Sequence, residues 1–292
     1  MVGESFKQKC AEWQNILEKA GVYAPAFELA EIITHATGLS RTEQLTAQVG
    51  NMASQDEAVL TGVQINGIDE VIRRRISGEP LQYIIGKWEF YGLEFYVGEG
   101  VLIPRAETET LVETALLLCK GNTAPKIADY CSGTGCVAIA LAHCLPKAEL
   151  TAVELSQEAC EYLLKNIELN NAVNVSLLKA DVLIDFWEGD EALDMITSNP
   201  PYICTAELEG LRREVQYEPK MALDGAEDGL LFYKKIAKNN KSHLKKGGWL
   251  VLEVGDTQSK EVYEILAENG YENIDTKKDL AGFTRVVYAQ RC

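Results

Sequence analysis

The feature that most constrains the fold is a regular alternation of apolar, strand-like runs and helical patterns beyond about residue 106. Runs of strand length occur at 126–130, 149–153, 175–180, 193–198 and 247–254. Helical periodicity fills intervals such as 137–145 and 157–169. Strands that alternate with helices form parallel sheets with helices on both faces. The segments 271–280 and 283–290 lie close together in the chain and favour an antiparallel hairpin at a sheet edge. The sequence therefore predicts a doubly wound α/β sheet.

A different pattern precedes this region. Phe6, Cys10, Trp13 and Leu17 recur at helical spacing, and "SRTE" at 40–43 matches a capping box. Apolar and aromatic residues then alternate about Gly92, as in a β-hairpin. We expect three parts, which are an N-terminal helical bundle over residues 1–82, a β-hairpin linker over 83–105 and the α/β domain over 106–292.

Composition narrows the class of protein. The chain has 292 residues and a formal charge of −16, which disfavours direct binding of nucleic acid because phosphate contacts need clustered Lys and Arg. Its eight cysteines form no CxxC pair and accompany only three histidines, so no metal site is expected. Cysteines inside apolar runs indicate a reducing compartment, and we expect a cytoplasmic monomer. No stretch has the length of a membrane span or a signal peptide core.

Polar residues follow four predicted strands, where a parallel sheet binds its ligands. "DYCSGTGC" places Asp129 before Gly133 and Gly135, and glycines allow a tight turn and a close approach to a ligand. Glu154 ends the second strand. It lies about 25 residues after Asp129 in the sequence, a separation typical of an acid that binds ribose hydroxyls. Asp181 follows the third strand. Each residue alone has an ordinary structural alternative, a tight connection or a helix cap. Together they outline a nucleoside site, without a complete GxGxxG or Walker pattern.

The fourth strand is followed by "NPPY", residues 199–202. With the glycine turn and the acid after the second strand, this tetrapeptide resembles the class I S-adenosylmethionine-dependent methyltransferases, whose Rossmann-like sheet has seven strands. In such enzymes the motif is typical of methylation at planar nitrogens. An Asn oxygen and a proline carbonyl can accept both N–H donors of a planar NH₂ while an aromatic ring packs on its face. The alternative is a rigid surface loop.

Flanking segments point to one family. "GEPLQYIIGKWEFYG" at 78–92, "LIPRAETE" at 102–109, "LEVGDTQ" at 252–258 and "DLAGFTRVV" at 279–287 together resemble the peptide chain release factor glutamine N5-methyltransferases. The resemblance implies transfer of a methyl group from S-adenosyl-L-methionine to the glutamine of a Gly-Gly-Gln loop, with S-adenosyl-L-homocysteine as product. It also implies that the helical domain binds the release factor and that no membrane is involved.

The resemblance assigns roles by position. The implied catalytic residues are Asn199, Pro200, Pro201 and Tyr202. The implied cofactor-binding residues are Asp129, Cys131, Ser132, Gly133, Thr134, Gly135, Glu154, Asp181, Val182 and Asn199. Two positions depart from the common pattern, since Cys131 replaces the first glycine of GxGxG and Glu154 replaces the commoner Asp. Arg105 is expected either to shape the cofactor entrance or to pair with a carboxylate, and Glu253 to brace the NPPY loop or to cap a helix.

Two rival functions remain. Adenine-N6 methyltransferases that act on nucleic acid also have NPPY-like motifs, but the acidic charge and the lack of a basic insert disfavour them. A non-catalytic adaptor that binds release factors is the other rival. An acceptor pair directed at an NH₂ group has no use in such a scaffold.

Overall fold

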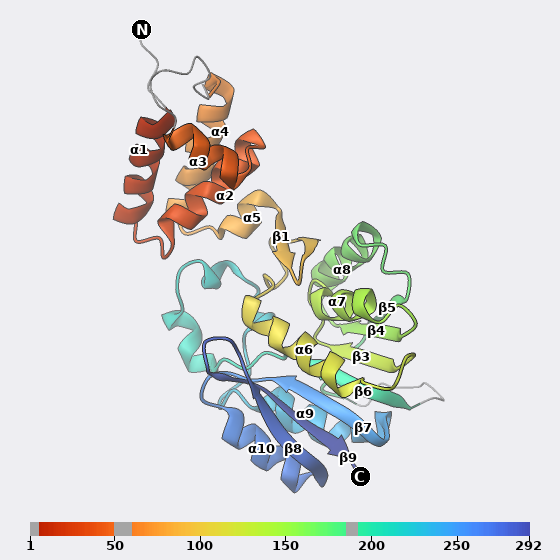
Figure 1. Cartoon of the computed structure of the whole chain (residues 1–292). Helices are drawn as coiled ribbons and strands as arrows, with labels where there is room; N and C mark the ends of the chain where they lie inside the picture. Colours follow the sequence, from red (N-terminus) through yellow and green to blue (C-terminus); the bar gives the residue numbers. More distant parts are fainter. Residues whose placement is uncertain (1–5, 50–59, 185–191) are drawn as a thin grey trace. The chain divides into compact units, whose positions relative to one another are not determined.

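The computed structural model describes residues 6–49, 60–184 and 192–292. The chain divides into two compact units, Met1–Gly86 and Lys87–Cys292. The first unit contains the helices shown in red to orange in Figure 1. Their bounds are α1 (Phe6–Lys19), α2 (Pro25–Thr37), α3 (Arg41–Val49), α4 (Gly62–Ile76) and α5 (Leu81–Ile85).

The helical unit has its own apolar core. The residues predicted for one face of α1 are all buried, and they pack with Ile32 and Ile33 of α2 and Ile68 of α4. The predicted capping box is confirmed at the start of α3. The Glu43 carboxylate accepts from the Ser40 N–H at 2.8 Å, and the Ser40 hydroxyl accepts from the Glu43 N–H at 3.3 Å.

The second unit begins with the predicted hairpin. Strands β1 (Lys87–Phe90) and β2 (Leu93–Tyr96) pair antiparallel. Tyr91 and Gly92 both have positive φ, 52° and 72°, as the two central residues of a type I′ turn require. The hairpin lies in the second unit, which begins at Lys87.

A seven-stranded sheet forms the centre of the second unit, in the order β5-β4-β3-β6-β7-β9-β8. The strands are β3 (Lys126–Tyr130), β4 (Glu149–Glu154), β5 (Val175–Lys179), β6 (Leu193–Ser198), β7 (Leu244–Glu253), β8 (Tyr271–Lys278) and β9 (Thr284–Arg291). The helices are α6 (Glu109–Leu118), α7 (Cys136–Cys144), α8 (Gln157–Leu169), α9 (Leu231–Asn239) and α10 (Ser259–Glu268). In the described sheet β9 runs antiparallel to both β7 and β8, the other neighbouring strands pair in parallel, and the edge hairpin β8–β9 is as predicted.

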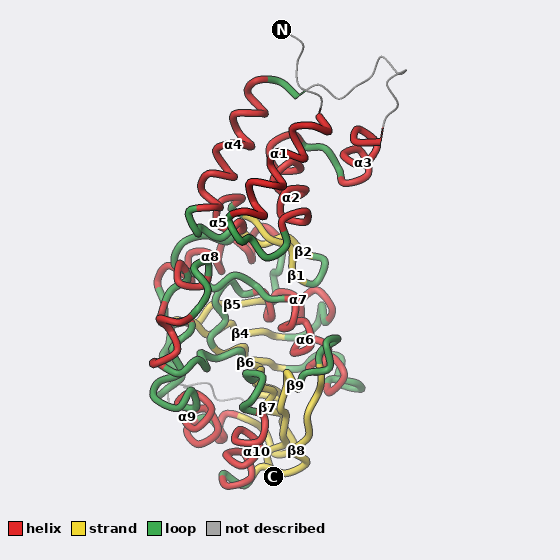
Figure 2. The backbone as a smooth tube through the Cα atoms, turned by 90° about the vertical axis from the view of Figure 1, so that its left-hand side faces the viewer, coloured by secondary structure: helices red, strands yellow, loops and turns green. Residues whose placement is uncertain are grey.

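Side chains alternate between the two faces of the sheet and form two core clusters. Val251 and Val286 join one cluster, which includes residues of α6 and α7, whereas Leu250 and Val287 join the other, which includes α9 and α10. Figure 2 shows these two helix pairs on opposite sides of the sheet. The doubly wound architecture predicted from the sequence is confirmed. In the described residues no helix is long and apolar enough to cross a membrane.

Strand order reverses between β3 and β6. Strands β4 and β5 lie on one side of β3, whereas β6 and β7 lie on its other side. At such a reversal the connections on either side lead to opposite faces of the sheet, which leaves a crevice at the carboxyl ends of the strands. The predicted glycine turn follows β3 and the NPPY segment follows β6. The topology therefore places both motifs beside this crevice.

Candidate active site

A cavity of about 230 Å³ lies at the carboxyl ends of the strands in the second unit. Most of the predicted site residues line it together: Asp129, Cys131, Ser132, Gly133, Thr134, Glu154, Asp181, Val182, Asn199 and Pro201. Gly135, Pro200 and Tyr202 are not among the lining residues. Four strand ends therefore meet at one cavity, as the topology requires.

The turn after β3 is built on left-handed backbone. Cys131, Gly133 and Gly135 have φ of 58°, 54° and 80°. A Cβ on Gly135 would lie 3.0 Å from Leu163 Cγ, whereas a Cβ on Gly133 would meet only Val101 Cγ2 at 3.9 Å. Gly135 thus permits close packing of the turn on α8, and Gly133 keeps backbone exposed to the cavity.

Asp129 braces the turn from below. Its carboxylate accepts from the Ser132 hydroxyl at 2.8 Å and from the Thr197 hydroxyl at 2.8 Å. Burial raises the pKa of Asp129 to about 7, although both hydrogen bonds act to lower it. The residue ties β3 to β6 and is 2% exposed.

Glu154 holds the opposite wall. One carboxylate oxygen accepts from the Gly133 N–H at 2.8 Å, and the other accepts from the N–H groups of Leu155 and Ser156, each at 2.8 Å. A carboxylate has about four acceptor sites, so these three bonds leave room for a ligand donor. Glu154 lines the cavity, which fits a ligand hydroxyl that donates to this oxygen pair.

Two asparagines of α9 and its C-terminal end fix the loop after β5. Asn239 donates to the Leu183 carbonyl at 2.9 Å, and Asn240 donates to the Val182 carbonyl at 3.0 Å. Asp181 accepts from the Leu183 N–H at 2.9 Å within the same loop. These bonds hold Asp181 and Val182 at the cavity wall.

The Asn199–Tyr202 segment forms a rigid corner after β6. The side-chain nitrogen of Asn199 donates to the Thr108 hydroxyl at 3.2 Å. Tyr202 packs against the core cluster that includes residues of α9 and α10, and burial raises the pKa of its hydroxyl to about 12. A Cβ on Gly225 would lie 2.8 Å from the Tyr202 Cα, so close approach of two backbones shapes this corner.

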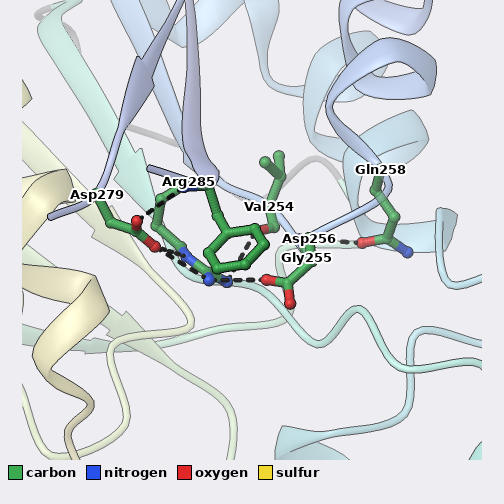
Figure 3. A network of polar contacts seen from close by, with 7 residues as sticks. Val254, Gly255, Asp256, Gln258, Asp279 and Arg285 are labelled. Carbon is green, nitrogen blue, oxygen red and sulfur yellow. Dashed lines mark hydrogen bonds and ion pairs between the residues drawn. The ribbon is translucent and has the colours of Figure 1, made fainter. Parts of the chain in front are cut away.

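A polar network supports the same corner from the turn after β7 (Figure 3). Arg285 forms ion pairs with Asp256 at 2.7 Å and with Asp279 at 3.3 Å. Gln258 accepts from the Gly255 N–H at 3.2 Å and donates to the Tyr202 carbonyl at 2.9 Å. The pair with Asp256 ties the buried Arg285 to the turn that carries Gln258, the pair with Asp279 ties it to the β8–β9 connection, and Gln258 holds Tyr202.

Arg105 lines the cavity and pairs with the buried carboxylate of Glu218, which also accepts from the Ile103 N–H at 3.0 Å. The expected pairing with a carboxylate is therefore confirmed, and a role for Arg105 at the cofactor entrance stays a prediction. Sequence reasoning missed other lining residues, Thr108, Met221 and Phe232 among them. Thr108 follows the "IPR" segment directly before α6, and only its position at that helix start could have singled it out.

Among the described residues, no group of three or more His, Cys, Asp and Glu side chains has metal-binding geometry. The cavity instead offers two carboxylates on one wall, from Glu154 and Asp181, and the side chains of Asn199 and Pro201 at the corner. Such a set of hydrogen-bond acceptors suits a neutral or cationic ligand with hydroxyl and amino groups.

Comparisons with known proteins agree with this geometry. Residues 8–86 match the family model "PrmC N-terminal domain", and residues 108–211 match "Methyltransferase small domain". The release factor glutamine methyltransferase of Thermodesulfovibrio yellowstonii is 39% identical over 267 residues, which cover 90% of this chain and 92% of that protein. The namesake from Geobacter sulfurreducens is 38% identical over 96% of this chain and 95% of its own.

The crystal structure of a methyltransferase from Pyrococcus furiosus is similar in fold, with a TM-score of 0.50 and 21% identity over 69% of this chain and 90% of that one. The similarity to the Pyrococcus furiosus protein supports the fold alone, whereas the identity and coverage of the two release factor glutamine methyltransferases also establish the family. This chain belongs to the release factor glutamine methyltransferase family.

Proposed function

We propose that the protein transfers a methyl group from S-adenosyl-L-methionine to the side-chain amide nitrogen of the glutamine in the Gly-Gly-Gln loop of peptide chain release factors. The observation that carries this proposal is the orientation of Asn199. Its nitrogen donates to Thr108, and Asn199 lines the cavity shared with Glu154. The amide oxygen, which has no donor among the described residues, is left to accept from a substrate NH₂.

The cavity residues fit the methyl donor. We propose that Glu154, which lines the cavity, accepts from ribose hydroxyls and that Asp181 and Val182, which also line it, contact the adenine edge. Gly133 also lines the cavity and contributes no side chain to it. When bound, S-adenosyl-L-methionine supplies a sulfonium methyl group.

The chain's own residues act on the acceptor nitrogen. The amide nitrogen would form a bond to the methyl group as the methyl–sulfur bond breaks and would release one proton to solvent, which leaves S-adenosyl-L-homocysteine and N5-methylglutamine as products. An amide nitrogen is a weak nucleophile because its lone pair is delocalised. Acceptors at Asn199 and at the Pro200 carbonyl would favour the pyramidal nitrogen of the transition state over the planar ground state.

The helical domain, residues 1–82, is proposed to recognise the release factor. Its match to a PrmC N-terminal domain and the overall charge of −16 support a protein partner rather than nucleic acid. Because release factors act in translation, we place the reaction in the cytoplasm, and we propose that the enzyme acts as a monomer.

The test is transfer of labelled methyl from S-adenosyl-L-methionine to purified release factor, with a Gln→Ala variant of its loop and adenine-rich DNA as alternative acceptors. Label on the intact factor alone is expected. Asn199→Ala should lower turnover by about a hundredfold or more, the usual cost of a lost transition-state hydrogen bond, while affinity for S-adenosyl-L-homocysteine changes little. Asn122→Ala, in an exposed turn, is the matched control. Label on DNA would overturn the proposal.

A further inference from the structure

Glu253 is a buried acid beside the Asn199 corner. Strands β6 and β7 pair in parallel with Ser198 opposite Leu252, so Asn199 and Glu253 follow at the same level. Glu253 is 2% exposed, and its Oε2 atom has no hydrogen-bond partner in the described part of the chain. A buried carboxylate with an unpartnered oxygen is costly, which calls for a role beyond packing.

Thr108 connects the two residues. It ends the 3₁₀ helix Ala106–Thr108 before α6 and is 2% exposed. Its hydroxyl accepts from the Asn199 side-chain nitrogen at 3.2 Å, and hydrogen bonding by Thr108 acts to lower the pKa of Glu253. A hydroxyl has one proton, so donation to Glu253 leaves only acceptor capacity toward Asn199. The carboxylate thereby determines which end of the Asn199 amide faces Thr108.

We propose that Thr108 and Glu253 are positioning residues that keep the Asn199 oxygen directed at the substrate amide. This inference rests on the proposed function of the corner. If Thr108 donated to Asn199 instead, the amide would turn and present its own N–H groups to a substrate that also donates. The series of contacts from Glu253 through Thr108 to Asn199, called the relay below, therefore selects the productive orientation of the Asn199 amide, a group that is nearly symmetric in shape.

The direction of the relay depends on the charge of Glu253. Burial raises the pKa of Glu253 to about 7, against lowering by the bond from Thr108 and by the charge of Arg285. The ionisable groups that face it are Arg285, Glu107, Arg105, Tyr202, Tyr233 and Cys136. A protonated Glu253 can donate to Thr108 and release the hydroxyl proton toward Asn199. Turnover should accordingly fall as pH drops below about 7.

The first experiment compares Thr108→Val, which keeps the shape and removes the hydroxyl, with Thr108→Ser, which keeps the hydroxyl. Methyl transfer to release factor is measured with each variant. We expect the valine variant to lose about tenfold or more in kcat, because a misdirected catalytic group is costly even without a gross change of structure. The serine variant should stay within about threefold of wild type. Affinity for S-adenosyl-L-homocysteine, measured by calorimetry, should be similar in all three proteins.

The second experiment records kcat against pH for wild type and Glu253→Gln. The wild-type acid limb near pH 7 should be absent in the glutamine variant, which has lower turnover throughout. Equal kcat in Thr108→Val and wild type, or an unchanged acid limb in Glu253→Gln, would overturn the inference. If the valine variant does not fold, the pH profile decides alone. Wild-type protein that methylates no release factor would instead refute the proposed function, and the inference with it.

Discussion

Cys131 has the left-handed backbone conformation that glycine adopts most easily, with φ of 58°. A residue with a Cβ pays roughly 1–2 kcal/mol in this region. The side chain nevertheless packs against the second core cluster and lines the cavity. Burial raises the pKa of the Cys131 thiol well above its usual value, so the group stays protonated and behaves as a small apolar side chain.

The strain at this residue predicts an unusual order of stability. Cys131→Gly should be more stable than Cys131→Ala by about 1 kcal/mol, because both lose the sulfur but only glycine is unstrained at this φ. Urea denaturation of the two variants gives the difference. Cys160, inside α8, is the control position, and there the alanine variant should be the more stable by about the same amount. An alanine preference at both positions would contradict the interpretation.

Among the elements, the glycine turn between β3 and α7 joins packing to binding. Gly133 and Gly135 share a left-handed φ, but a Cβ on Gly135 would be pressed against Leu163 and Ile139, at 3.0 and 3.3 Å. Contacts this short require the neighbouring side chains to move. At Gly133 the added atom would point into the space beside Val101. One position therefore limits how closely the turn approaches α8, and the other limits how closely a ligand approaches the turn.

Substitution separates these two effects. Gly135→Ala should lose roughly 1–3 kcal/mol more stability than Gly133→Ala, because overpacking adds to the strain that both variants share. Gly133→Ala should show the larger loss of affinity for S-adenosyl-L-homocysteine. Thermal unfolding without ligand and calorimetric titration measure the two quantities. The same ranking of the variants in both measurements would show that the turn acts as a single structural unit.

The sequence pattern predicted several elements to the residue, including β3, β6 and α8, because the two strands are short, nearly continuous buried runs and the helix buries one face at helical spacing. It also predicted which strand ends meet, since parallel strands direct their carboxyl ends to one edge. Local periodicity could not predict the hydrogen bond between Asn199 and Thr108. These residues are 91 positions apart, and their contact depends on how the segment before α6 packs over the sheet. The conformation of Cys131 was likewise hidden, because a cysteine does not signal positive φ.

For the whole molecule, two buried acids in an already acidic chain affect stability. Burial raises the pKa of Asp129 from 3.8 and of Glu253 from 4.5, each to about 7. At pH values between the ordinary pKa and the raised pKa of these acids, the folded state binds more protons than the unfolded state. The contribution of these groups to the free energy of unfolding is therefore full at low pH and falls as pH rises toward 7.

A difference measurement isolates this effect from the other acids. The stability of Asp129→Asn relative to wild type should rise between pH 4 and 7, by up to about 1.4 kcal/mol for each pH unit, because only the wild type must ionise a buried carboxyl group. Loss of the bonds to Ser132 and Thr197 shifts the curve without changing its slope. Urea denaturation across this pH range gives the curve, with substitution of the exposed Glu272 by Gln as the control for replacing an acid at the surface. A flat curve for Asp129→Asn would mean that its hydrogen bonds offset burial and keep the carboxyl group ionised throughout this range.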